Sequence, residues 1–96
     1  MTKREFYKQL TKMKFTRIIT CEGEKTDYFY IDLPRIRVVF NKWNNKEYGL
    51  YVRDVEDDNM CNNLVLKTFK KLDEQKIKFI KKFIDFLKEV KWNDIQ

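Results

Sequence analysis

The residues between Asp27 and Asp54 alternate between two chemical types, and this alternation constrains the fold more than any other feature of the sequence. One parity is apolar and comprises Phe29, Ile31, Leu33, Ile36, Val38, Phe40, Leu50 and Val52. The other comprises Tyr28, Tyr30, Arg35, Arg37, Tyr51 and Arg53. Because successive strand side chains point to opposite faces of a sheet, the apolar set is expected to close a core. The second set, called the Tyr/Arg face below, is expected to face outward, with Arg17 at its edge.

Turn residues divide this region into strands. We predict strands over residues 15–21, 28–33, 35–43 and 47–53, with turns at 22–25 and 44–46. Gly49 falls inside the last of these strands, which predicts a bulge or a close backbone approach there. The segment Leu64–Leu66 fits either a fifth strand or the first turn of a helix, and strand is the favoured alternative.

A helix is predicted on each side of the strands. Thr2 and Glu5 have the spacing of a capping box, and Phe6, Leu10 and Met13 follow as an apolar stripe. Near the other end, Asp73 is a predicted helix cap. The apolar residues of 77–90 fill one half of the helical wheel, an arc wide enough to cover a sheet.

These elements predict one α+β domain over residues 1–96. The expected architecture has a short N-terminal helix, an antiparallel sheet of four to five strands, and a long C-terminal amphipathic helix packed on one sheet face. The short helix is expected to share that face or to cover a sheet edge. No internal repeat or linker divides the chain.

The amino-acid composition excludes several enzyme classes. The chain has no His and no Ser, so it cannot form a Ser-His-Asp triad, a Cys-His dyad or a histidine metal site. The acidic segment 54–59 could hold Mg²⁺ or Ca²⁺, but it lacks the glycine and terminal glutamate of an EF-hand loop. We therefore expect a protein that is not an enzyme and that uses no cofactor and no metal.

A basic charge excess points to acidic partners. The net charge is +6, and lysines gather on the polar side of the predicted C-terminal helix, with Lys78, Lys81 and Lys82 as candidate contacts. Such contacts to phosphate would be independent of sequence and sensitive to salt. The plainer alternative is a solvated helix face.

Three interpretations of the Tyr/Arg face remain open. Tyrosine rings and arginine suit base stacking and phosphate pairing, which predicts binding to single-stranded nucleic acid or to a nucleoprotein complex. The same residue types are enriched in protein interfaces, which suits a phage or mobile-element inhibitor that docks on a host nucleic-acid-handling protein such as a CRISPR nuclease, as anti-CRISPR proteins do. Alternatively, tyrosine serves strand formation and arginine serves solubility.

The strands followed by one long helix, over about residues 15–90, resemble the PC4 family of single-strand binders in topology. Met1 to Leu10 is charged and has no apolar run, so we expect a cytoplasmic protein whose two cysteines, Cys21 and Cys61, are free and partly buried. No stretch of the sequence reaches the length of a membrane span. The oligomeric state stays open, and a dimer is compatible with the sequence.

Overall fold

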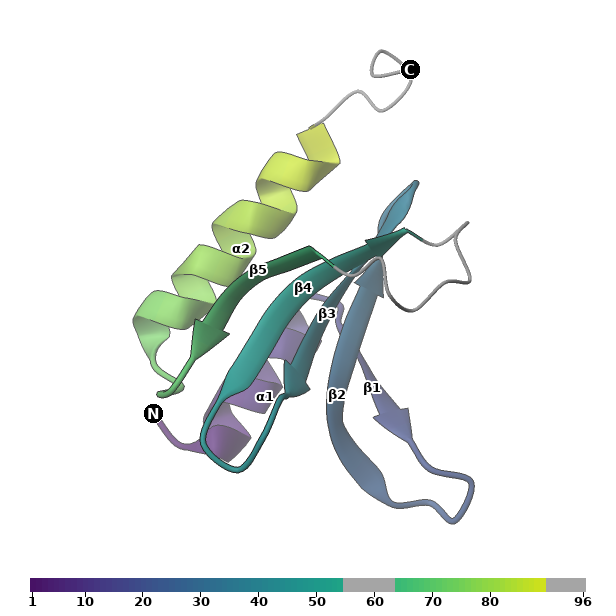
Figure 1. The fold of residues 1–96 in the computed structure, drawn as a ribbon, viewed down its shortest axis with the longest axis vertical. Coiled ribbons are helices and arrows are strands. Elements are labelled where there is room, and N and C mark those ends of the chain that lie inside the picture. The colour runs from purple at the N-terminus through teal and green to yellow at the C-terminus, as the bar shows by residue number, and fades with distance from the viewer. Residues whose placement is uncertain (55–63, 90–96) are drawn as a thin grey trace.

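The computed structural model describes residues 1–54 and 64–89, which form two helices and five strands. In chain order they are α1 (Lys3–Lys12), β1 (Thr16–Ile19), β2 (Lys25–Asp32), β3 (Ile36–Lys42), β4 (Tyr48–Asp54), β5 (Leu64–Phe69) and α2 (Glu74–Glu89). The strands form one antiparallel sheet in the order β1-β2-β3-β4-β5 (Figure 1). The predicted α+β architecture is confirmed, and Leu64–Leu66 belongs to a fifth strand.

Both predicted helix caps are present. The backbone N–H of Glu5 donates to Thr2 Oγ1 over 3.1 Å at the start of α1. At the start of α2, the N–H of Lys76 donates to Asp73 Oδ1, also over 3.1 Å. Each cap satisfies an amide that has no partner within its own helix. The first β hairpin turns at Gly23, whose φ of 87° favours glycine.

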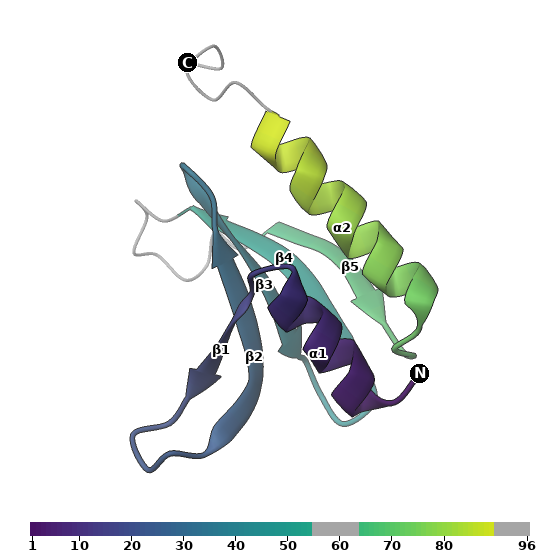
Figure 2. The same ribbon diagram turned by 180° about the vertical axis from the view of Figure 1, so that it is seen from behind.

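The two helices share one face of the sheet and bury a common core against it (Figure 2). Phe6 and Leu10 of α1, Ile80 and Ile84 of α2, and the apolar sheet residues belong to one cluster. Phe29, Phe40 and Leu50 face one another across three strands because they are register partners. The apolar parity of the sequence is therefore the covered face.

The apolar arc of α2 is wider than the surface it covers. Ile80, Ile84 and Leu87 are buried, whereas Phe79 is 36% and Phe86 63% exposed. The predicted packing of α2 on one sheet face is confirmed, but part of its apolar arc stays exposed. No helix in residues 1–54 or 64–89 is long and apolar enough to cross a membrane. Cys21 is free but exposed, contrary to its expected partial burial, and Cys61 lies outside the described residues.

Candidate functional site

The Tyr/Arg face is the side of the sheet opposite both helices. Strand pairing sets Tyr30 opposite Val39, Val39 opposite Tyr51, and Arg37 opposite Arg53. Directly opposed residues in a sheet point to the same face. The structure therefore brings together Tyr28, Tyr30, Arg37, Tyr51 and Arg53, as the alternation predicts. Arg35 is half-buried in the turn before β3.

Arg37 is held in a defined position on this face. Its guanidinium lies 4.1 Å from the centre of the Tyr30 ring. Its Nε and Nη2 atoms donate to the two carboxylate oxygens of Asp32 over 2.7 and 3.1 Å. These hydrogen bonds raise the pKa of Arg37. One planar surface of the guanidinium rests on Tyr30, so the stack can offer its other surface to a further ring.

Two arginines stand side by side at this position. Arg37 and Arg53 are register partners, and like charges directly opposite each other in a sheet repel. Among the described residues, Asp32 is the carboxylate that forms an ion pair with Arg37. A bound anion would relieve the repulsion between the two guanidinium groups. The site thus combines aromatic surface with a pair of cations.

Trp43 is part of this site, although it is not among the residues predicted for the Tyr/Arg face. Its indole packs on Gly49 of β4 and meets the Tyr51 ring edge-on, with centroids 6.1 Å apart. A Cβ on Gly49 would lie 2.3 Å from the indole, so the close approach predicted at Gly49 is made by a side chain. The Trp43 side chain remains 49% exposed. Trp43 has the same parity in the sequence as Arg37 and Val39, and this alternation is the signal that could have placed it on the Tyr/Arg face.

The aromatic rings form a partly buried layer above the sheet. Val39 is fully buried and Tyr51 is 8% exposed, although neither belongs to the core under the helices. Burial, together with the neighbouring Tyr51, raises the pKa of the Tyr28 hydroxyl. These side chains therefore support one another and form a surface with little freedom to rearrange.

Arg17 is not at the edge of the Tyr/Arg face, and that expectation is wrong. Arg17 is the register partner of Phe29, so its side chain lies on the helical side of the sheet. The guanidinium carbon is 5.0 Å from the Tyr7 ring centre and 5.3 Å from that of Phe29. Arg17 also has the parity of Phe15, which is buried in the core, so alternation along β1 itself places Arg17 on the covered face.

The candidate lysines of α2 also lie in the helical layer. Lys78 and Lys81 line a groove between the two helices, together with Lys12, Lys14 and Lys88. Lys82 is exposed on the same helix but does not line that groove. The sheet arginines and the helix lysines are therefore on opposite layers and cannot meet in one small binding site.

A buried tyrosine anchors α1 to β2 beside Arg17. The Tyr7 hydroxyl donates to Asp27 Oδ1 over 2.7 Å, and Lys3 Nζ lies 3.2 Å from the same oxygen. Burial raises the pKa of Tyr7 far above its ordinary value, and the contact with Asp27 adds to this effect. For Asp27, burial acts to raise the pKa, but the Tyr7 and Lys3 contacts outweigh it and lower the pKa.

Replacing Asp27 with asparagine is expected to lower the free energy of unfolding by about 1 kcal/mol at pH 7, since charged hydrogen bonds are lost at a partly exposed site. The folded-state pKa of Asp27 is lowered, so its stabilisation is present above the unfolded pKa of about 3.9 and is lost as pH falls through the folded pKa. Urea titrations at pH 7 and pH 3 should therefore show a difference that shrinks in acid. Asp32→Asn serves as the control, because it breaks the exposed Asp32–Arg37 ion pair on the other face of the sheet. It should change the free energy of unfolding by less than about 0.5 kcal/mol.

Among the described residues, no group of three or more His, Cys, Asp and Glu side chains could hold a metal ion. Most of the acidic segment 54–59 lies outside those residues. No family model, no curated protein and no solved structure matches this chain. The topological resemblance to single-strand binders thus gains no support from these comparisons.

Proposed function

We propose that this protein is a non-enzymatic binder of single-stranded nucleic acid. It acts in the cytoplasm and binds the strand through the Tyr/Arg face. The observation that carries the proposal is the Arg37–Arg53 pair set among Tyr28, Tyr30 and Tyr51. Bases stack on aromatic rings and on guanidinium planes, and phosphates pair with the same arginines. No described helix covers this face, so an extended strand can reach it.

The lysines of α2 have a separate role in this proposal. They lie in the opposite layer, where Lys78, Lys81 and Lys82 attract polyanions over a longer range. Contacts of this kind raise the association rate and make affinity depend on salt, without reading sequence. The Tyr/Arg face supplies the stacking and hence most of the residence time on the strand.

Tyr30→Ala is expected to weaken binding of a fluorescent single-stranded oligonucleotide by about 5- to 150-fold. The range corresponds to about 1–3 kcal/mol for one stacked base, and the substitution also removes the support of Arg37. Fluorescence anisotropy at low salt measures the change, with DNA and RNA oligonucleotides tested separately. Arg53→Gln should reduce the slope of log affinity against log salt by about 0.7.

Phe86→Ala is the matched control, because it removes an exposed aromatic ring from the helical layer. It should leave affinity unchanged. If the wild-type protein binds neither single-stranded DNA nor RNA at low salt, the proposed function is wrong. If the wild type binds but Tyr30→Ala binds equally well, the Tyr/Arg face is not the binding surface.

A second candidate is an inhibitor of the anti-CRISPR type that docks on a host protein. The exposed apolar side chains at the β5 side of the molecule favour it, since Leu64 and Phe86 are each 63% exposed. Capture of a host protein that survives nuclease treatment and is lost in Phe86→Ala would support docking over nucleic-acid binding.

A further inference from the structure

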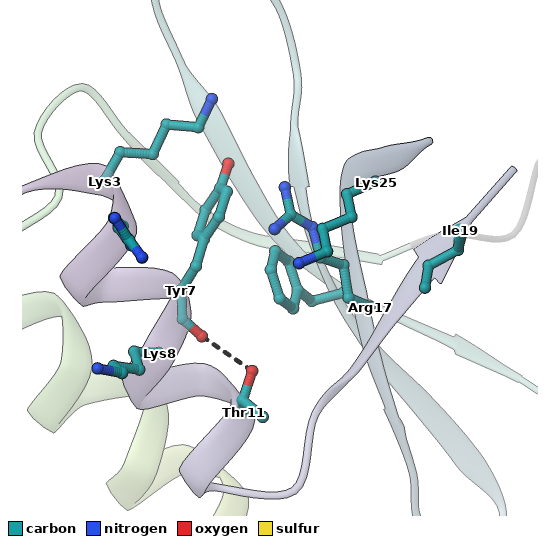
Figure 3. Close-up of a pocket in the computed structure, with 9 residues that line it drawn as sticks. Lys3, Tyr7, Lys8, Thr11, Arg17, Ile19 and Lys25 are labelled. Carbon is teal, nitrogen blue, oxygen red and sulfur yellow. Dashed lines mark hydrogen bonds between the residues drawn. The ribbon is translucent and has the colours of Figure 1, made fainter. Parts of the chain in front are cut away.

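A second basic site lies between α1 and the β1–β2 hairpin. It is a cleft of about 610 Å³, lined by Lys3, Arg4, Tyr7, Lys8, Thr11, Arg17, Ile19, Lys25 and Phe29. Arg17 and Lys25 extend from the hairpin toward Tyr7, which lies on α1 (Figure 3). The cleft belongs to the helical layer and is therefore separate from the Tyr/Arg face.

The charge of this cleft is strongly one-sided. Five of its nine lining residues are Lys or Arg, and none of the nine is Asp or Glu. Asp27 stands beside the cleft, but Tyr7, Lys3 and Arg17 already contact its Oδ1 oxygen. Arg4, Lys8 and Lys25 form no ion pair with a described residue. Five cations around one concave surface focus a positive potential that attracts a multiply charged anion.

Arg17 gives the cleft a fixed donor. Its Nε donates to the backbone oxygen of Thr26, and its guanidinium packs on the rings of Tyr7 and Phe29. Because the protein already holds this side chain in place, little rotamer freedom is lost when a ligand binds. The lysines around it are exposed and can adjust to the ligand.

We propose that this cleft binds an oligophosphate, meaning two or more phosphate groups linked in a chain. A single carboxylate would not balance five cations, whereas linked phosphates carry several negative charges and present many acceptor oxygens. The volume lies within the range of small-molecule sites. Two sources share this chemistry: a free oligophosphate, including that of a nucleotide, and consecutive phosphates of a nucleic-acid backbone.

Isothermal titration of the full chain with sodium tripolyphosphate at low salt tests the proposal. The double variant Arg4→Gln/Lys25→Gln is expected to weaken binding at least 10-fold. Both side chains are exposed, so the variant should fold, whereas Arg17 packs on two rings and is left unchanged. The matched control Lys46→Gln/Lys70→Gln removes the same charge from exposed positions outside the cleft and should change affinity less than twofold.

Absence of tripolyphosphate binding, or equal weakening in the two double variants, would overturn the proposal. Competition by an oligonucleotide without a terminal phosphate supports the site with a nucleic-acid backbone as the source. Competition by a nucleoside triphosphate alone supports it with a free oligophosphate as the source. Tyr30→Ala should leave tripolyphosphate affinity unchanged, so this result is independent of whether the Tyr/Arg face binds nucleic acid.

Discussion

Truncating Phe40 to alanine is expected to lower the free energy of unfolding by about 3–5 kcal/mol. The Phe40 side chain is fully buried at the centre of the sheet. Aromatic rings from α1 and from neighbouring strands surround it, namely those of Phe6, Tyr7, Phe29, Tyr48 and Phe69. A cavity at this point removes contacts with α1 and with three strands together. Since domains of this size have about 5–15 kcal/mol of stability, urea unfolding followed by circular dichroism should show a large shift in midpoint.

Phe86→Ala is the control for this substitution. It deletes the same side chain from α2, where Phe86 is 63% exposed, and should change stability by less than about 0.5 kcal/mol. Similar losses in the two variants would mean that the core does not lie between the helices and the apolar sheet face.

Val39→Lys is expected to lower the free energy of unfolding by about 2–3 kcal/mol, although residue 39 is on the side of the sheet without a described helix. Val39 is fully buried among the rings of the Tyr/Arg face, between its partners Tyr30 and Tyr51. An ammonium group there must leave water, and Arg37 and Arg53 on the same face repel it. Thermal and urea unfolding at pH 7 measure the loss.

Val65→Lys makes a matched comparison, because Val65 is the register partner of Tyr51 on the same face but is 45% exposed on an outer strand. Lysine is well tolerated on outer strands, so the change should be within about 0.5 kcal/mol. If both lysines have the same small effect, the rings do not cover Val39 and the Tyr/Arg face is not a fixed surface.

The two faces of the sheet could be predicted from alternation because strand register is strongly specified here. A slip of one residue would move Phe29, Phe40 and Leu50 from the core to the opposite face, at a large cost in buried apolar area. The helix ends could likewise be predicted, since Thr2 and Asp73 satisfy local backbone amides. The alternation along a strand and the caps of a helix both depend on residues that are close together in the sequence.

The errors have physical causes. Arg17 is not on the Tyr/Arg face because it is the register partner of Phe29, and its parity is that of Phe15, which is buried in the core. Phe86 is exposed although it belongs to the apolar arc of α2, because the buried part of that helix is the narrower stripe of Ile80, Ile84 and Leu87. The cleft was missed because α1 and the hairpin contribute its cations from segments that have no common pattern.

The order of the strands along the sheet repeats their order along the chain. Every strand pairing therefore joins strands that are consecutive in the sequence, and the described connections between β1 and β4 are short. Loop closure of this kind demands little entropy, so each hairpin can form before the next. The contact between α1 and α2 is different, because it joins the two ends of the chain. Closing the sheet is therefore a local process, whereas bringing α1 and α2 together on it requires contacts between distant parts of the chain.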